Sequence, residues 1–146
     1  MISQEIKVQK GDINNKSIPN TYVPGRNLVF LSLAAGLCES VNAEKIFVGF
    51  NQLDYTGYPD CRQEFIDAFE SAINKGIAMT VDKKKGIKID APLISMSKSK
   101  IIRKGIEQGI DIESTWSCYE GGDRPCMRCD ACLLRQKGLE EVNKKG

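Results

Sequence analysis

Four cysteines late in the chain have the residue type and the spacing of a metal site. They follow the pattern C-x7-C-x2-C-x2-C and are Cys118, Cys126, Cys129 and Cys132. Zinc accepts four thiolates in a tetrahedron, and each C-x2-C step brings two sulfurs to one ion through a tight turn. We expect a structural zinc site, in which the protein fills all four positions and leaves none for a substrate.

The rival ligand of these thiols is an iron–sulfur cluster, because C-x2-C-x2-C also opens ferredoxin motifs. Those motifs continue with C-x3-C-P, whereas this chain has Gln136 at that place. Thiols without any ligand are the third alternative. The first residues, Met-Ile-Ser-Gln-Glu-Ile-Lys, show no export signal, so we expect a cytoplasmic location, where thiols bind metal rather than form disulfides.

A second group of residues has the chemistry of an anion site. Pro24-Gly25 turns the chain into an apolar helix, and Arg26 and Asn27 stand at the start of that helix. Backbone N–H groups and the helix dipole favour an anion there, and an arginine adds a fork of donors for phosphate or carboxylate. The alternative is a plain loop with an asparagine cap and a solvated arginine.

A third group follows the apolar run at residues 46–50 and has the chemistry of a pocket for a flat ring. The carboxylates of Asp54 and Asp60 suit the N–H edge of a purine-like ring, and the rings of Tyr55 and Tyr58 suit stacking on it. The guanidinium of Arg62 suits an anion, and the thiol of Cys61 suits nucleophilic attack. Ligands bind at the carboxyl ends of strands in open α/β sheets. The alternative is a turn-rich loop in which Asp60 caps the next helix.

Three further observations limit the possible chemistry. Lys98 stands at a helix start after Ser97 and is another candidate for an anion, with a solvated surface lysine as the alternative. The sequence contains no histidine, which excludes Ser-His-Asp and Cys-His catalysis. A formal net charge of +2 and the lack of any apolar run of about 18 residues argue against a nucleic-acid arm and a membrane span.

The elements that must position these groups alternate between helices and strands. We expect helices from about residue 27 to 38 (buried on all sides), 62 to 74, 98 to 109 and 131 to 142. We expect strands at residues 46–50, 77–81 and 87–94. This alternation predicts one α/β domain over residues 1–146 with a parallel sheet. The strands are few, so the sheet is expected to be part of a larger one.

Three motifs in order carry a family resemblance over about residues 10–140. They are T-Y-V-P-G-R-N at residues 21–27, N-Q-L-D-Y-T-G-Y-P-D-C-R-Q-E-F at 51–65, and the segment from W-S-C-Y-E-G-G at 116–122 to C-L-L-R at 132–135. The chain resembles the 7-cyano-7-deazaguanine synthase family of queuosine and archaeosine precursor biosynthesis. The resemblance implies a partial Rossmann-like sheet of the adenine nucleotide alpha hydrolase type, with a zinc-binding segment at residues 114–135.

The resemblance also implies an activity and its partners. Members of the family are ligases that use ATP, with Mg²⁺, to convert 7-carboxy-7-deazaguanine and ammonia to 7-cyano-7-deazaguanine, and they form homodimers. The implied zinc ligands are the four cysteines. The implied substrate or nucleotide contacts are Arg26, Asn27, Asp54, Tyr55, Tyr58, Asp60, Arg62 and Lys98. No nucleic acid or membrane partner is implied.

The chain departs from the family pattern in one respect. The family begins with a strand and the phosphate-binding loop S-G-G-x-D-S, and this loop does not occur in the 146 residues. The chain matches roughly the last two thirds of the pattern, so we expect a fragment that does not hydrolyse ATP alone. The alternatives are a split enzyme, in which another polypeptide supplies the loop, and an inactive zinc-stapled binding module.

Overall fold

A computed structural model describes residues 7–14, 17–51, 57–83 and 85–144. The chain divides into two compact units. We call Val23–Gln52 with Tyr58–Ser95 the sheet unit, and Met1–Tyr22, Leu53–Gly57 and Met96–Gly146 the cysteine unit. The expectation of a single domain over residues 1–146 stays a prediction, because compact units of this size also occur inside one domain.

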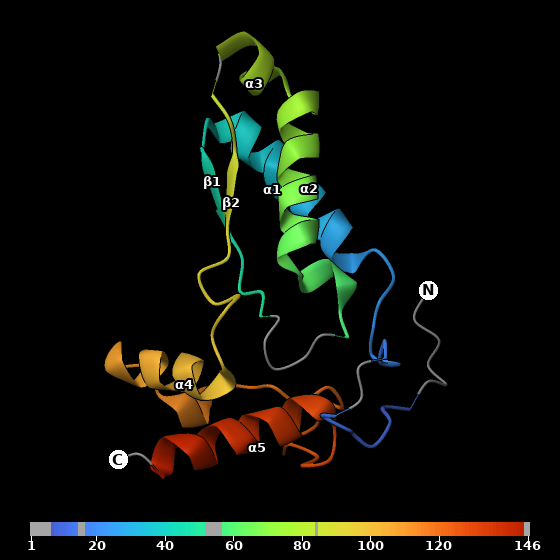
Figure 1. Cartoon of the computed structure of the whole chain (residues 1–146), viewed down its shortest axis with the longest axis vertical. Coiled ribbons are helices and arrows are strands. Elements are labelled where there is room, and N and C mark those ends of the chain that lie inside the picture. Colours follow the sequence, from blue (N-terminus) through green and yellow to red (C-terminus); the bar gives the residue numbers. More distant parts are fainter. Residues whose placement is uncertain (1–6, 15–16, 52–56, 84, 145–146) are drawn as a thin grey trace. The chain divides into compact units, whose positions relative to one another are not determined.

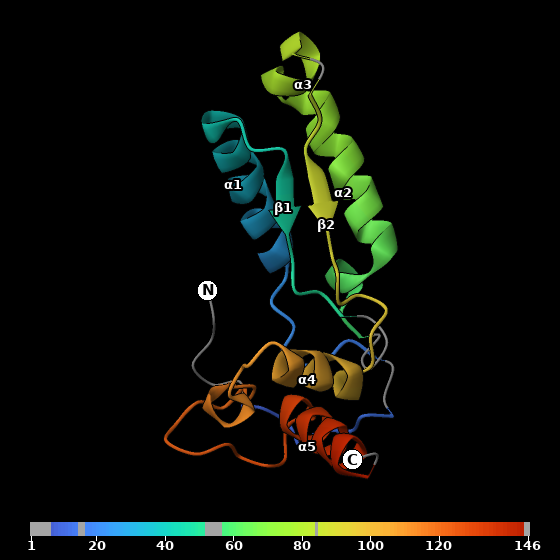
Figure 2. The ribbon, with the colours of Figure 1, turned by 90° about the vertical axis from the view of Figure 1, so that its left-hand side faces the viewer.

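The sheet unit has the predicted α/β character. Its elements are α1 (Arg26–Val41), β1 (Lys45–Phe47), the 3₁₀ turn η1 (Pro59–Cys61), α2 (Gln63–Gly76), α3 (Ala78–Lys83) and β2 (Lys88–Asp90). The two strands are parallel, and Ile46 lies opposite Ile89 (Figures 1 and 2). The predicted parallel sheet is therefore confirmed, in two short strands.

One face of this sheet carries the core of the unit. Ile46 and Ile89 pack with Leu31 of α1 and Ile66 of α2 in a single buried cluster. Both helices therefore cover the same face of the sheet, α1 beside β1 and α2 beside β2, as Figure 2 shows. Cys38 of α1 is buried in the same cluster.

The prediction that residues 77–81 form a strand is wrong. Residues Ala78–Lys83 form α3, and Met79 is buried in the core of the sheet unit. The Met79 N–H donates to Oε1 of Glu39, 3.0 Å away on α1, which satisfies a donor in the first turn of this short helix. A short apolar run fits a buried helix as well as a strand, so periodicity could not separate the two.

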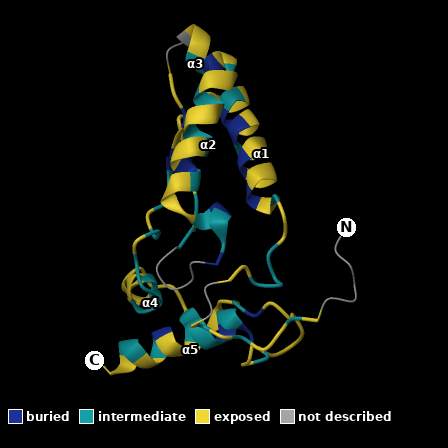
Figure 3. Cartoon of the chain, turned by 45° about the vertical axis from the view of Figure 1, so that its right-hand side comes forward, coloured by how far each residue is buried: buried dark blue, intermediate teal, exposed yellow. Residues whose placement is uncertain are grey.

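The prediction that α1 is buried on all sides is also wrong. Leu31, Ala35 and Cys38 face the core, whereas a second row of large apolar side chains is exposed. Buried and exposed segments alternate along α1 in Figure 3. Asp60 does not cap α2 either, because the N-cap of this helix is Arg62 and no side chain accepts a capping hydrogen bond there.

The cysteine unit consists of helices and irregular chain in its described residues. Its elements are α4 (Lys98–Glu107), the 3₁₀ turn η2 (Ile112–Ser114) and α5 (Asp130–Asn143). Ser97 caps α4, since its Oγ accepts from the N–H of Lys100. The two helices approach closely at Gly138, where an added Cβ would lie 2.9 Å from Cδ1 of Ile102. Within the described ranges, no helix combines the length and the apolarity that a membrane crossing requires.

Candidate metal centre and candidate anion site

The four cysteines are positioned by a loop that folds back on the start of α5. Gly121 and Gly122, with φ of 71° and 88°, reverse the chain after Cys118. A second tight turn between Cys126 and Cys129 places Met127 at φ 56°. Cys129 is the N-cap of α5 and Cys132 lies in the first turn of this helix, so both C-x2-C steps end at a rigid element.

The four sulfurs have the spacing of a single tetrahedral ion. All four Sγ atoms lie within 4.8 Å of one another, and those of Cys126 and Cys132 are 4.0 Å apart. A tetrahedron with Zn–S bonds of about 2.3 Å places its sulfurs about 3.8 Å apart. Three of the four thiols are buried. The donor set and its geometry therefore fit zinc, and they fit it better than a cluster that spreads its cysteines over several irons.

Backbone N–H groups already favour negative charge on some of these sulfurs. The Cys126 N–H donates to Sγ of Cys118 at 3.3 Å, and the Cys129 N–H donates to Sγ of Cys126 at 3.4 Å. The pKa of Cys126 is lowered to about 7, first by the backbone N–H of Arg128. Burial raises the pKa of Cys132 to about 12. Binding of a divalent ion would therefore displace protons, above all from Cys132.

The segment of residues 8–12, which we call the strap, lies against this centre, and the sequence did not predict this contact. The Gly11 N–H donates to the carbonyl of Arg128 at 2.7 Å, and the Asp12 N–H donates to Oδ1 of Asp130 at 2.8 Å. Val8 packs on the buried cysteines. The only local signal is the turn-forming pair Gly11-Asp12, which does not reveal a partner more than a hundred residues away.

The candidate anion site lies at the start of α1, in the sheet unit. Gly25 is the N-cap, with φ 72°, and the exposed Arg26 and buried Asn27 follow it. Nδ2 of Asn27 donates to the carbonyl of Asp60 at 3.3 Å and to Sγ of Cys61 at 3.5 Å. Nε of Arg26 donates to Oδ1 of Asn27 at 3.2 Å. The side chain of Asn27 therefore joins the second predicted group to the third across 33 residues.

The thiol in this site is held in its neutral form. The pKa of Cys61 is raised first by burial and then by the charge of Asp60, and it is lowered less by Arg26 and the hydrogen bond from Asn27. Asp60 itself is buried in η1. Because the thiolate is the nucleophile, this environment disfavours attack by Cys61 at neutral pH.

The other predicted contacts are placed differently. Tyr58 is half-buried directly before η1, and Arg62 is exposed at the start of α2. Asp54 and Tyr55 lie outside the described residues. Lys98 belongs to the cysteine unit, where its stem packs on Gly138 of α5, with Cγ 2.9 Å from the position of an added Cβ.

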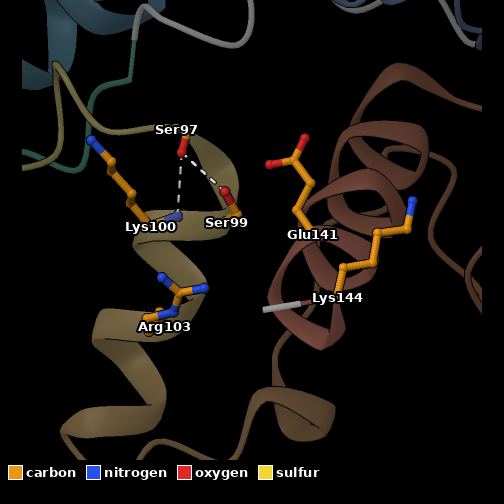
Figure 4. A pocket seen from close by; sticks show the side chains of 6 residues that line it. All are labelled: Ser97, Ser99, Lys100, Arg103, Glu141 and Lys144. Carbon is orange, nitrogen blue, oxygen red and sulfur yellow. Dashed lines mark hydrogen bonds between the residues drawn. The ribbon is translucent and has the colours of Figure 1, made fainter. Parts of the chain in front are cut away.

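A hollow of about 280 Å³ lies between α4 and α5 (Figure 4). Its lining residues are Ser97, Ser99, Lys100, Arg103, Glu141 and Lys144. Lys98 is not among them, so the cations of this hollow differ from the one that the sequence indicated.

Comparison with known proteins gives consistent matches over almost the whole chain. A family model described as "Queuosine biosynthesis protein QueC" matches residues 1–143. A 7-cyano-7-deazaguanine synthase of Thermoplasma acidophilum is 45% identical over 143 residues, which are 97% of this chain and 59% of the relative. The enzyme of the same name from Acetivibrio thermocellus is 51% identical over 126 residues, 86% of this chain and 56% of the relative. The chain thus spans about three fifths of the length of these relatives.

Proposed function

Because the chain belongs to the family described as queuosine biosynthesis protein QueC, we propose that it supplies the deazaguanine pocket and a zinc-binding segment for 7-cyano-7-deazaguanine synthesis. The reaction converts 7-carboxy-7-deazaguanine and ammonia to the nitrile at the expense of ATP. The observation that carries this proposal is the side chain of Asn27, which joins the start of α1 to η1. This contact supports the proposal that two motifs far apart in the sequence contribute to one site.

The residues of this site have separate roles in the proposal. Arg26, exposed at the helix start, binds the substrate carboxylate or a phosphate through its fork of donors. The carboxylate of Asp60 accepts from the N–H edge of the deazaguanine, and Tyr58 stacks on the ring. Asp54, Tyr55 and Arg62 complete the contacts with the substrate. Asn27 positions the other groups by holding η1 against α1.

The co-substrates ATP and ammonia supply most of the chemistry of the proposed reaction. ATP, with Mg²⁺, activates the carboxylate, ammonia forms the amide, and a second activation allows dehydration to the nitrile. We propose that the protein groups bind and orient the ring while these steps proceed, and that Cys61 stays a neutral thiol. Lys98 is proposed as a further cation for the nucleotide or substrate anion.

Zinc is the proposed resident ion of the four cysteines, and its role is structural because no coordination position is left open. The donor set of four thiolates supports this choice, as does their spread of less than 4.8 Å. We also propose that the protein forms a homodimer and that it is located in the cytoplasm.

Binding of 7-carboxy-7-deazaguanine to the zinc-loaded chain tests the proposal, with isothermal titration calorimetry as the measurement. Arg26→Gln removes a charge-assisted hydrogen bond of about 1.5–3 kcal/mol, so we expect the affinity to fall about 10- to 150-fold. Arg103→Gln, which removes an exposed arginine of α4, is the matched control and should leave the affinity unchanged. Equal affinities of the two variants would refute the assignment of Arg26. No binding by the folded chain would favour the inactive zinc-stapled module.

A further inference from the structure

An ion pair closes the loop between the first two cysteines of the candidate metal centre. Nε and Nη2 of Arg128 both donate to Oε1 of Glu120, at 3.0 and 2.7 Å. Glu120 lies two residues after Cys118, and Arg128 lies two residues after Cys126. The pair therefore holds the two ends of this loop together at matching positions, one just past each ligand.

The backbone of Arg128 contacts the centre as well. Its N–H donates to the sulfur of Cys126, and this hydrogen bond is the first cause of the low pKa of that thiol. Its carbonyl accepts from the Gly11 N–H of the strap at 2.7 Å. One residue thus connects a candidate ligand, the loop that precedes this ligand, and the strap.

The loop itself needs such support, because it includes Gly121 and Gly122. Glycine loses more conformational freedom on ordering than any other residue. The Cys126 N–H donates to Sγ of Cys118 at 3.3 Å, so the two ends of the loop must stay in register for the sulfurs to meet. The ion pair of Glu120 with Arg128 fixes this register from the side chains.

The charge of Arg128 also suits the centre. Four thiolates outweigh one divalent ion, so the loaded centre is negative and a nearby cation stabilises it. The pKa of Arg128 is raised first by the hydrogen bond and charge of Glu120 and then, less, by the charge of Cys126. The guanidinium is therefore within electrostatic reach of this sulfur. Groups around metal ligands orient the ligands and tune the affinity for the ion.

We propose that Arg128 is a positioning residue of the metal centre, whose guanidinium, aimed by Glu120, fixes the loop between Cys118 and Cys126 so that the four sulfurs meet one ion. Arg128 does not bind the ion itself. The inference rests on the proposed zinc site and is independent of the proposed reaction. The side chains of Arg128 and Glu120 are 62% and 26% exposed, so the effect is that of a forked pair which solvent partly screens.

The zinc affinity of the full 146-residue chain tests the proposal, with competition by a chromophoric chelator as the measurement. Arg128→Gln should weaken zinc binding about 3- to 10-fold, because the fork to Glu120 is lost. Arg128→Lys keeps the charge without the fork and should have an intermediate affinity. Arg124→Gln is the matched control. Arg124 lies in the same loop, is exposed and has no ion pair in the described part of the chain, so its loss should change the affinity less than about twofold.

A double-mutant cycle separates positioning from a general loss of charge. In a Glu120→Ala chain, Arg128→Gln should cost less than about twofold, because the guanidinium no longer has the carboxylate that aims it. Hydrogen exchange of the zinc-loaded chains gives a second readout. Exchange at the Cys126 amide should be faster in Arg128→Gln and unchanged in Arg124→Gln. Unchanged exchange in α1 and α2 verifies that the variants are folded.

Three results would overturn the proposal. The first is a zinc affinity of Arg128→Gln within about twofold of the parent. The second is an equal loss in Arg124→Gln, which would leave only an effect of net charge. The third is an equal effect of Arg128→Gln with and without Glu120. A parent chain that binds neither zinc nor cobalt would refute the zinc site and this inference with it. No substrate enters these measurements, so their outcome is separate from the test of Arg26.

Discussion

Replacement of Gly11 by alanine should loosen the metal centre although residue 11 contributes no ligand. An added Cβ would lie 2.6 Å from the N atom of Asp130, 2.7 Å from its Oδ1 and 2.8 Å from the carbonyl carbon of Cys129. Two of these three atoms belong to the backbone at the start of α5, which cannot rotate away as a flexible side chain would. The strap must therefore move off the helix start.

The magnitude follows from the contacts that this movement breaks. The strap makes two backbone hydrogen bonds to the centre, at 2.7 and 2.8 Å, from Gly11 and Asp12. At about 0.5–1.5 kcal/mol each, their loss costs about 1–3 kcal/mol. Because zinc binding is coupled to the folding of its site, this loss corresponds to a zinc affinity about 5- to 150-fold weaker.

Competition with a chromophoric chelator at neutral pH measures the zinc affinity directly. Gly36→Ala is the control, since Gly36 lies in α1 with open space around an added Cβ, and alanine there should raise the free energy of unfolding by up to about 1 kcal/mol. A Gly11→Ala chain that binds zinc within twofold of the parent, with the same thermal midpoint, would show that the strap does not support the centre.

Three further outcomes are expected. Cobalt should give the strong visible bands of tetrahedral thiolate coordination, and Cys129→Ser should weaken them and lower the affinity for the ion by more than tenfold, since this thiol is fully buried. Gly138→Val should force α4 from α5 and lower the thermal midpoint, because even one added carbon meets Ile102 at 2.9 Å; an unchanged midpoint would contradict the close approach. Burial and the Asp60 charge raise the pKa of Cys61, so alkylation of this thiol should be slow at pH 8 and rise with pH. Asp60→Asn removes one of these causes, lowers the pKa and should speed alkylation at pH 8, as mass mapping of the modified peptide would show.

The sequence is sufficient to predict those parts of the fold that depend on residues close together in the chain. Ser97 provides a cap for α4, and the two C-x2-C steps provide the turn before α5, so these features follow from neighbours in the chain. The gathering of the four cysteines is predictable for the same reason. The parallel sheet follows from the alternation of helices and strands.

Features that depend on distant partners were not predictable in this way. The N–H of Met79 finds its acceptor on Glu39, which helps residues 78–83 to form a helix instead of a strand. The hydrogen bond from Asp12 spans 118 residues, and no local pattern encodes it. The exposed apolar row of α1, which includes Phe30, Leu33 and Leu37, differs from the expectation of a helix buried on all sides, because apolar residues are expected inside a folded protein.

The strap has a consequence for the order of folding. Its hydrogen bonds join Gly11 and Asp12 to residues 128–130, so they close one of the longest loops that this chain allows. Closing a loop of that length carries a large entropic cost that local contacts cannot offset early. The cysteine turn and α5 involve only neighbouring residues, so the ion can assemble them first. The centre then forms first, and the segment of Gly11 and Asp12 docks on it afterwards.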